Sequence, residues 1–176
     1  AKLTVTDYDI NDNVASLSNS GIVEVAASKK LTVTGDVINN NELTVNGTLT
    51  ATTELYNAAN AKIEGVGNIG VDKNIAKLTN KGSIGTVDNK VNITISANEI
   101  VNNNEINIAK IVATTFKNYY AYSSVNVNGA HLESIVFVNA GTVNVTGELS
   151  KVLITNEVTG TGQFVMEGVN LTSGNT

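Results

Sequence analysis

An asparagine-led phrase recurs along the chain and restricts it to a repetitive fold. The clearest copy begins at residue 39 and runs Asn-Asn-Asn-Glu-Leu-Thr-Val-Asn-Gly, and close variants begin at Asn102 and Asn139. Each copy joins turn-forming residues to a short alternation of apolar and polar residues. One copy alone would fit a β-hairpin turn in an antiparallel meander. Its return at a regular interval instead indicates a solenoid.

The repeat is about twenty residues long, which is within the range of known solenoid repeats. Equivalent asparagines, each closing a strand before a turn, are Asn19, Asn39, Asn57, Asn80, Asn102, Asn139 and Asn156. Their spacings are 20, 18, 23, 22, 37 and 17 residues. Aligning residues 125–129 (Val-Asn-Val-Asn-Gly) with residues 143–147 (Val-Asn-Val-Thr-Gly) places a degenerate equivalent at Ala121. This position divides the wide gap into two ordinary ones.

Apolar residues four and six positions after these asparagines alternate as in a strand. They are Val23 and Val25, Leu43 and Val45, Ala61 and Ile63, Ile106 and Ile108, Val125 and Val127, and Val143 and Val145. A glycine follows at Gly47, Gly65, Gly129 and Gly147, where a corner needs a permissive backbone. Alternation with period two argues against a helical repeat. The least strand-like stretch, residues 114–124, is where a helical turn or an excursion would fit.

These patterns predict an all-β fold, a single parallel β-solenoid of about 20 residues per coil. A repeat this short cannot bury its own apolar face, so its coils must stack on one another. We expect about seven to nine coils and a rod roughly 35–45 Å long, from a strand spacing near 4.8 Å. Val, Ile, Leu and Ala must build the core, because aromatic residues make up only 5% of the chain. The 27 asparagines predict a hydrogen-bonded ladder along one corner.

We assign the whole chain, residues 1–176, to one domain. Residues 1–18 are interpreted as an N-terminal cap or strand, residues 19–162 as the repeat coils, and residues 163–176 as a C-terminal cap. Uncapped solenoid ends expose strand edges that promote aggregation, which is why we expect caps.

The phrases N-x-[GN]-x-[ILV]-x-V at Asn39, Asn102 and Asn139 resemble the repeats of bacterial surface proteins. These are right-handed parallel β-helices of adhesins and autotransporter passengers, and the resemblance covers about residues 19–163. It implies right-handed winding, export to a bacterial cell surface or the extracellular space, and an adhesive or stalk role. Glycans or host and microbial surface proteins are the partners it implies. The chain is short for such a protein, and a fragment or one domain of a longer protein is one interpretation.

The charge balance excludes several other partners. The formal net charge is −5, and the cations are lysines without any arginine. Nucleic-acid binding requires clustered cations and favours arginine, and anionic membrane surfaces also attract polybasic segments. No apolar run has the length of a membrane-spanning helix. The absence of cysteine excludes disulfides and cysteine-based metal or redox sites.

A calcium site is one interpretation of the pattern Asp7-x-Asp9-x-Asn11 near the start of the chain. Carboxylate and amide oxygens are the hard ligands that calcium prefers. An EF-hand is rejected, because that loop needs glycine at the position of Asp12 and glutamate at the position of Ser18. A looser calcium site is therefore weighed against a solvated cap rich in turns. No other cofactor is predicted.

The candidate ligand-binding residues are Tyr119, Tyr120 and Tyr122, which are three of the five tyrosines. Exposed rings beside Asn118 and Lys117 would stack on sugar rings and leave polar groups for their hydroxyls. The alternative is that the rings pack on one another at an enlarged corner, with their hydroxyls in water.

No catalytic residue is predicted, and we expect a non-enzymatic protein. A glycoside hydrolase needs a close pair of carboxylates. Glu42 and Glu105 share a register but lie three coils apart, about 14 Å along the axis. Lyases on this fold generally use a basic residue, often arginine, and His131 stands alone in the sequence. A polysaccharide lyase or glycoside hydrolase on a β-helix scaffold is the alternative function.

Overall fold

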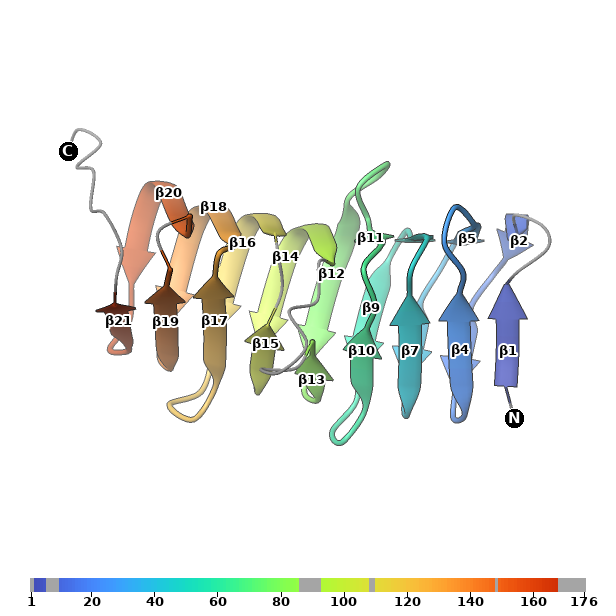
Figure 1. Ribbon diagram of the computed structural model, residues 1–176, viewed down its shortest axis with the longest axis horizontal. Coiled ribbons are helices and arrows are strands. Elements are labelled where there is room, and N and C mark those ends of the chain that lie inside the picture. Colours follow the sequence, from blue (N-terminus) through green and yellow to red (C-terminus); the bar gives the residue numbers. More distant parts are fainter. Residues whose placement is uncertain (1, 6–9, 86–92, 108–109, 148, 168–176) are drawn as a thin grey trace.

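The protein is a parallel β-solenoid of about seven turns, as expected from the sequence. The computed structural model describes residues 2–5, 10–85, 93–107, 110–147 and 149–167. Within these residues every secondary-structure element is a strand, and equivalent strands recur about 20 residues apart. The strands stack along one axis, with the first strand at one end and the last strand at the other (Figure 1).

Sheet A runs along one whole side of the solenoid and receives one strand from each coil. Its order follows the sequence and all of its pairings are parallel. The strands are β1 (Lys2–Val5), β4 (Ile22–Val25), β7 (Glu42–Val45), β10 (Lys62–Glu64), β13 (Ser83–Ile84), β15 (Glu105–Asn107), β17 (Ser124–Asn128), β19 (Thr142–Thr146) and β21 (Gln163–Glu167).

Sheet B forms the rest of the wall and changes shape along the rod. In the early coils it consists of two separate rows of short strands. One row is β2 (Ile10–Val14), β5 (Lys30–Val33), β8 (Thr48–Ala51) and β11 (Asn68–Ile69), and the other is β3 (Leu17–Asn19), β6 (Val37–Asn39), β9 (Glu54–Asn57) and β12 (Ile75–Asn80). The later coils have single nine-residue strands instead: β14 (Thr94–Asn102), β16 (Lys110–Asn118), β18 (His131–Asn139) and β20 (Lys151–Thr159).

Strand β14 joins the two rows, because its first half pairs with β11 and its second half with β12. The corner between the rows survives inside the long strands as a change of phase. In β14, β16 and β18, two consecutive residues point outward at the middle of the strand, and the alternation then resumes. This change of phase explains the exposure of Ile135, which occupies the first of those two positions in β18.

The winding of the chain is visible in Figure 1. The strands of sheet A lie toward the viewer and run upward, the chain passes behind at the top, and each coil advances toward the left. A coil that turns and advances in this sense is right-handed. This is the hand that the resemblance to bacterial β-helices implied.

The core is a set of stacked apolar rows between the two sheets. Val, Leu and Ile supply most of the buried side chains, in agreement with the expectation from composition. Two phenylalanines replace aliphatic residues in the later coils: the rings of Phe116 and Phe137 stack with centroids 5.2 Å apart. Phe164 of β21, in sheet A, lies 5.7 Å from Phe137 with its ring tilted by 49°. In β21, Phe164 and Met166 pair with Val143 and Val145, so the apolar rows extend into the last strand.

A ladder of buried asparagines runs along the corner between sheet B and sheet A. In each rung but the last, the side-chain Nδ2 donates a hydrogen bond to Oδ1 of the asparagine in the next coil, at 2.8–2.9 Å. The rungs are Asn19, Asn39, Asn57, Asn80, Asn102, Asn118 and Asn139. The predicted ladder is confirmed, with the exceptions given below.

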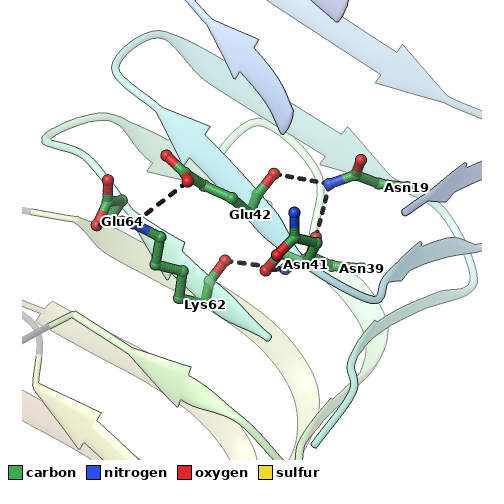
Figure 2. A network of polar contacts seen from close by, with 6 residues as sticks. All are labelled: Asn19, Asn39, Asn41, Glu42, Lys62 and Glu64. Carbon is green, nitrogen blue, oxygen red and sulfur yellow. Dashed lines mark hydrogen bonds and ion pairs between the residues drawn. The ribbon is translucent and has the colours of Figure 1, made fainter. Parts of the chain in front are cut away.

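The same amides also fasten sheet A to the corner. Asn19 Nδ2 donates to the backbone oxygen of Glu42 at 2.6 Å, and Asn39 Nδ2 donates to that of Lys62 at 2.9 Å (Figure 2). The rungs at Asn57, Asn80 and Asn102 repeat this contact one coil at a time. These five amides thus use both of their protons, which avoids the cost of an unsatisfied buried donor.

Two of the positions assigned to the ladder were wrong. Asn118 forms the rung for which Ala121 was predicted, and Ala121 lies exposed in the turn beyond it. Asn156 was also assigned as a rung, but it lies within β20, and it is Gly160 that stacks on Asn139. Asn156 lies near the middle of β20, between the partners of Ser134 and Val136, and is therefore several residues short of the position that opposes Asn139.

The predicted alignment also fails by two residues after Asn57. Ile63, and not Ala61, pairs with Leu43, because three turn residues and Ala61 precede β10. Gly65 therefore lies over Val45, with a φ of +123° and space for no side chain, since a Cβ atom would be 2.1 Å from the Val45 oxygen. Ile108 lies outside the described residues.

Most of residues 114–124 form strand, although this is the least strand-like stretch of the sequence. Residues 114–118 complete β16 and contain the buried Phe116. The turn occupies residues 119–123, so the expected excursion is confined to that corner. Stacking against β14 and β18 decides the conformation of residues 114–118, because local propensity is a weak guide to strands.

Candidate functional site

The tyrosine corner is the turn of residues 119–123, which directly follows the ladder residue Asn118. Ser123 is buried and closes this turn. Its Oγ donates to the backbone oxygen of Tyr120 at 2.6 Å and accepts from the Tyr120 N–H at 3.2 Å. The Ser123 N–H also donates to the Tyr120 oxygen at 3.0 Å. The ladder and these bonds give the tyrosines a fixed base.

The three predicted tyrosines are brought together and remain exposed. Tyr119, Tyr120 and Tyr122 have 55%, 42% and 72% of their surface accessible. The ring of Tyr120 lies edge-on to Tyr119 at 5.0 Å and stacks on Tyr122 at 5.1 Å, with an interplanar angle of 10°. The rings therefore pack on one another, as one of the two interpretations expected, and they still present aromatic surface to solvent. Such pairs contribute about 0.5–1.5 kcal/mol beyond the area they bury.

Two further residues beside the ladder, in earlier coils, were not singled out from the sequence. Tyr56 is the residue before the rung Asn57, and Lys81 is the residue after the rung Asn80. Lys81 Nζ lies 5.4 Å from the centre of the Tyr56 ring, which is within the range of a cation–π contact. The feature of the sequence that could have identified Tyr56 and Lys81 is their position next to ladder asparagines. A sequence search for clustered aromatics does not detect them, because Tyr56 and the tyrosine corner are about sixty residues apart.

The environment of Lys81 stabilises its positive charge. A hydrogen bond to the Tyr56 hydroxyl raises the pKa of Lys81, and charge attraction to Tyr56 and Tyr120 adds to this effect. Partial desolvation opposes it. Lys81 thus places an ammonium group beside the Tyr56 ring.

The proposed calcium ligands are not tested by the structure. Asp7 and Asp9 lie outside the described residues, and for Asn11 only the backbone, within β2, is described. In the part of the chain that the structure describes, no group of three or more His, Asp or Glu residues is placed to hold a metal ion.

A pair of carboxylates meets on the outer face of sheet A, at Lys62. Lys62 Nζ lies 3.3 Å from Glu42 Oε2 and 3.5 Å from Glu64 Oε2 (Figure 2). Partial burial alone would lower the pKa of Lys62, but the hydrogen bond to Glu42 and the charges of Glu64 and Glu42 raise it overall. The ammonium group occupies the space between the carboxylates, where a scissile glycosidic bond would have to lie. This arrangement is suited to joining neighbouring strands.

The other residues considered as catalytic candidates are Glu105, three coils from Glu42, and His131. Glu105 and Glu42 do share a register, with Ser83 and Lys62 in the coils between them. His131 pairs in register with Lys110 and Lys151 of the neighbouring strands, so cations flank it on both sides.

No protein-family model, curated protein or solved structure matches this chain. Within the described residues there is no helix with the length and apolar character required to cross a membrane.

Proposed function

We propose that the protein is a non-catalytic, exported bacterial surface protein that acts as a stiff spacer and contacts glycans through the tyrosine corner. The observation that carries this proposal is the exposure of three packed tyrosine rings on one outward turn. Soluble proteins rarely leave clustered large side chains in water, and such patches often mark binding surfaces. Exposed tyrosines have an aromatic face and a hydroxyl group, and they suit ligands that have both apolar faces and hydroxyl groups.

The rod supports the role of a spacer. Nine stacked strands at about 4.8 Å give sheet A a length of roughly 40 Å. Seven rungs of asparagine bind successive coils to one another at one corner. A solenoid built in this way holds the tyrosine corner at a fixed distance from either end, which suits a domain that presents a contact away from a cell surface.

A non-catalytic role is consistent with the position of the carboxylates. Glu42 and Glu64 are joined through Lys62 on the outer face of a sheet. General acid catalysis of glycoside cleavage needs one carboxyl group that can deliver a proton to a bound substrate. Lys62 occupies the space between Glu42 and Glu64, and lysines flank His131 in the neighbouring strands, which favours a structural role for these groups.

A glycan array on the purified protein tests the binding role, with Tyr122→Ala and the exposed, distant Val66→Ala as a matched pair. We expect glycan retention by the protein and by Val66→Ala, and a loss with Tyr122→Ala. Assays for new reducing ends and for unsaturated sugar products should stay at background on the same glycans. Turnover of any of them would overturn the proposal in favour of the carbohydrate-active enzyme. Labelling of intact bacteria with an antibody to the domain tests export.

A further inference from the structure

The residues that directly follow successive ladder asparagines stack on one another and form a column over several coils. The first residue after each rung stacks on the one in the coil before: the N–H groups of Lys81, Asn103 and Tyr119 donate to the oxygens of Asn57, Asn80 and Asn102, each at 2.8 Å. Lys81 and Tyr119 are therefore two coils apart, about 10 Å along the axis. Tyr56 lies at the Lys81 end of this column.

Between the two aromatic groups lies Asn103, whose Oδ1 is buried and has no hydrogen-bond partner among the described residues. A buried acceptor without a partner is uncommon in folded proteins and costs about 1–3 kcal/mol. The column thus contains, in order, a ring with a cation, the partly buried Asn103, and three further rings. Its length corresponds to more than one sugar unit.

Lys81 differs from other lysines whose contacts the structure gives. Lys62 is bound by Glu42 and Glu64, and Lys117 is bound by Glu99 at 2.5 Å. No carboxylate in the described part of the chain lies within ion-pair distance of Lys81, and its contacts are aromatic. Its positive charge is therefore not neutralised by the protein and can pair with an anion brought by a ligand.

From this column we infer that Tyr56 and Lys81 belong to the same site as Tyr120 and Tyr122, and that the site selects acidic sugars, whose rings carry a carboxylate or sulfate group. The outer faces of the tyrosine rings contact the C–H face of a sugar ring, and the ammonium of Lys81 pairs with the acid group of a neighbouring unit. The inference rests on the proposed glycan contact and specifies its ligand class.

The probes that test it are oligogalacturonate and its methyl ester, which have the same sugar rings with and without the negative charges. Both are added to the glycan array, and their binding in solution is followed by saturation-transfer NMR on the tyrosine rings. We expect oligogalacturonate to bind about three- to tenfold more tightly than the ester at low salt. This preference should shrink as salt is added, because surface charges are screened.

Variants separate the roles of the residues. Lys81→Gln should remove the preference for the acidic probe and leave binding of the ester unchanged. Tyr120→Ala should weaken both probes by up to about tenfold. Lys151→Gln, an exposed lysine of β20 on another face, is the charge-matched control and should change neither. Circular dichroism and a thermal melt confirm that each variant is folded.

The possible failures are distinguishable. Equal affinity for the two probes, or a preference that survives Lys81→Gln, overturns the inference and leaves the proposed glycan contact in place. Binding to neutral glycans alone on the array would likewise overturn the preference for acidic sugars and leave the proposed glycan contact in place. If no glycan on the array is retained, both the inference and the proposed function are overturned.

Discussion

Asn57 and Asn80 are 23 residues apart in the chain, and the Nδ2 of Asn57 lies 2.8 Å from the Oδ1 of Asn80. Asn102 and Asn118 are 16 residues apart and form the same bond at 2.9 Å. The ladder therefore fixes the point at which each coil closes, whereas the number of residues in a coil varies. Extra residues are placed in turns and corners, where they disturb no rung.

Asn80→Ala removes a central rung and should destabilise the protein by about 2–3 kcal/mol. It leaves Asn57 Nδ2 without its acceptor, and Asn102 Oδ1 and the backbone oxygen of Glu105 without a donor. The shift of the urea midpoint measures the effect. Asn40→Ala changes an exposed asparagine in the turn after Asn39. It should lower the free energy of unfolding by less than about 0.5 kcal/mol. Equal effects of the two substitutions would contradict the structural role of the ladder.

Val45→Asp should prevent cooperative folding. Val45 is fully buried in the apolar row of sheet A, and an unpaired carboxylate there would have no compensating partner. The loss should be visible as a missing β-sheet signal in circular dichroism and a missing thermal transition. Val66→Asp makes the same chemical change at a valine that is 59% exposed and should leave the transition nearly in place. A folded Val45→Asp protein would show that the assigned core face is wrong.

Gly65→Ala and Gly129→Ala separate steric contact from backbone strain. Both glycines have positive φ, +123° and +61°, so alanine is strained at either position. At Gly129 nothing lies within 4 Å of an added Cβ, and we expect a loss of about 1–2 kcal/mol. At Gly65 the Cβ would also strike the Val45 oxygen, so the loss should be clearly larger in urea denaturation. The reverse order would indicate that sheet A does not pack as closely there as described.

The ion pairs of Lys62 should contribute stability that depends on pH in the alkaline range. The folded-state pKa of Lys62 is raised above the ordinary value of 10.5, so its contribution is fully present below that value and is lost as pH rises through the folded pKa. Lys62→Gln should therefore lower the free energy of unfolding at neutral pH, by at most about 1 kcal/mol because the side chain is partly exposed.

The measurement for Lys62 is the difference in urea midpoint between the protein and Lys62→Gln as a function of pH. Taking the difference removes the effect of tyrosine ionisation, which both proteins share. We expect a constant gap through the neutral range and a shrinking gap above pH 10.5. A gap that widens at alkaline pH would contradict the assigned ion pairs.

Much of the fold follows from local features of the sequence. The recurring asparagines and the alternation at Leu43 and Val45 predict strands, corners and stacking, because a short repeat has no other way to bury its apolar residues. Six of the seven rungs of the ladder were identified from spacing alone. The tyrosine cluster was also evident, since its members are consecutive or nearly so.

Tertiary structure decided the features that depend on register between coils. Asn118 replaces Ala121 as a rung and Ile63 replaces Ala61 in the core, because turn length varies from coil to coil and pairing with the previous coil sets the alignment. The merging of two strand rows into β14 has the same origin. Likewise, Lys81 and Tyr56 lie on the same side of the rod as the tyrosine corner only because the coils stack, about 5 Å apart along the axis. The sequence determined the unit and its repetition, and the stacking of the coils determined which side chains meet.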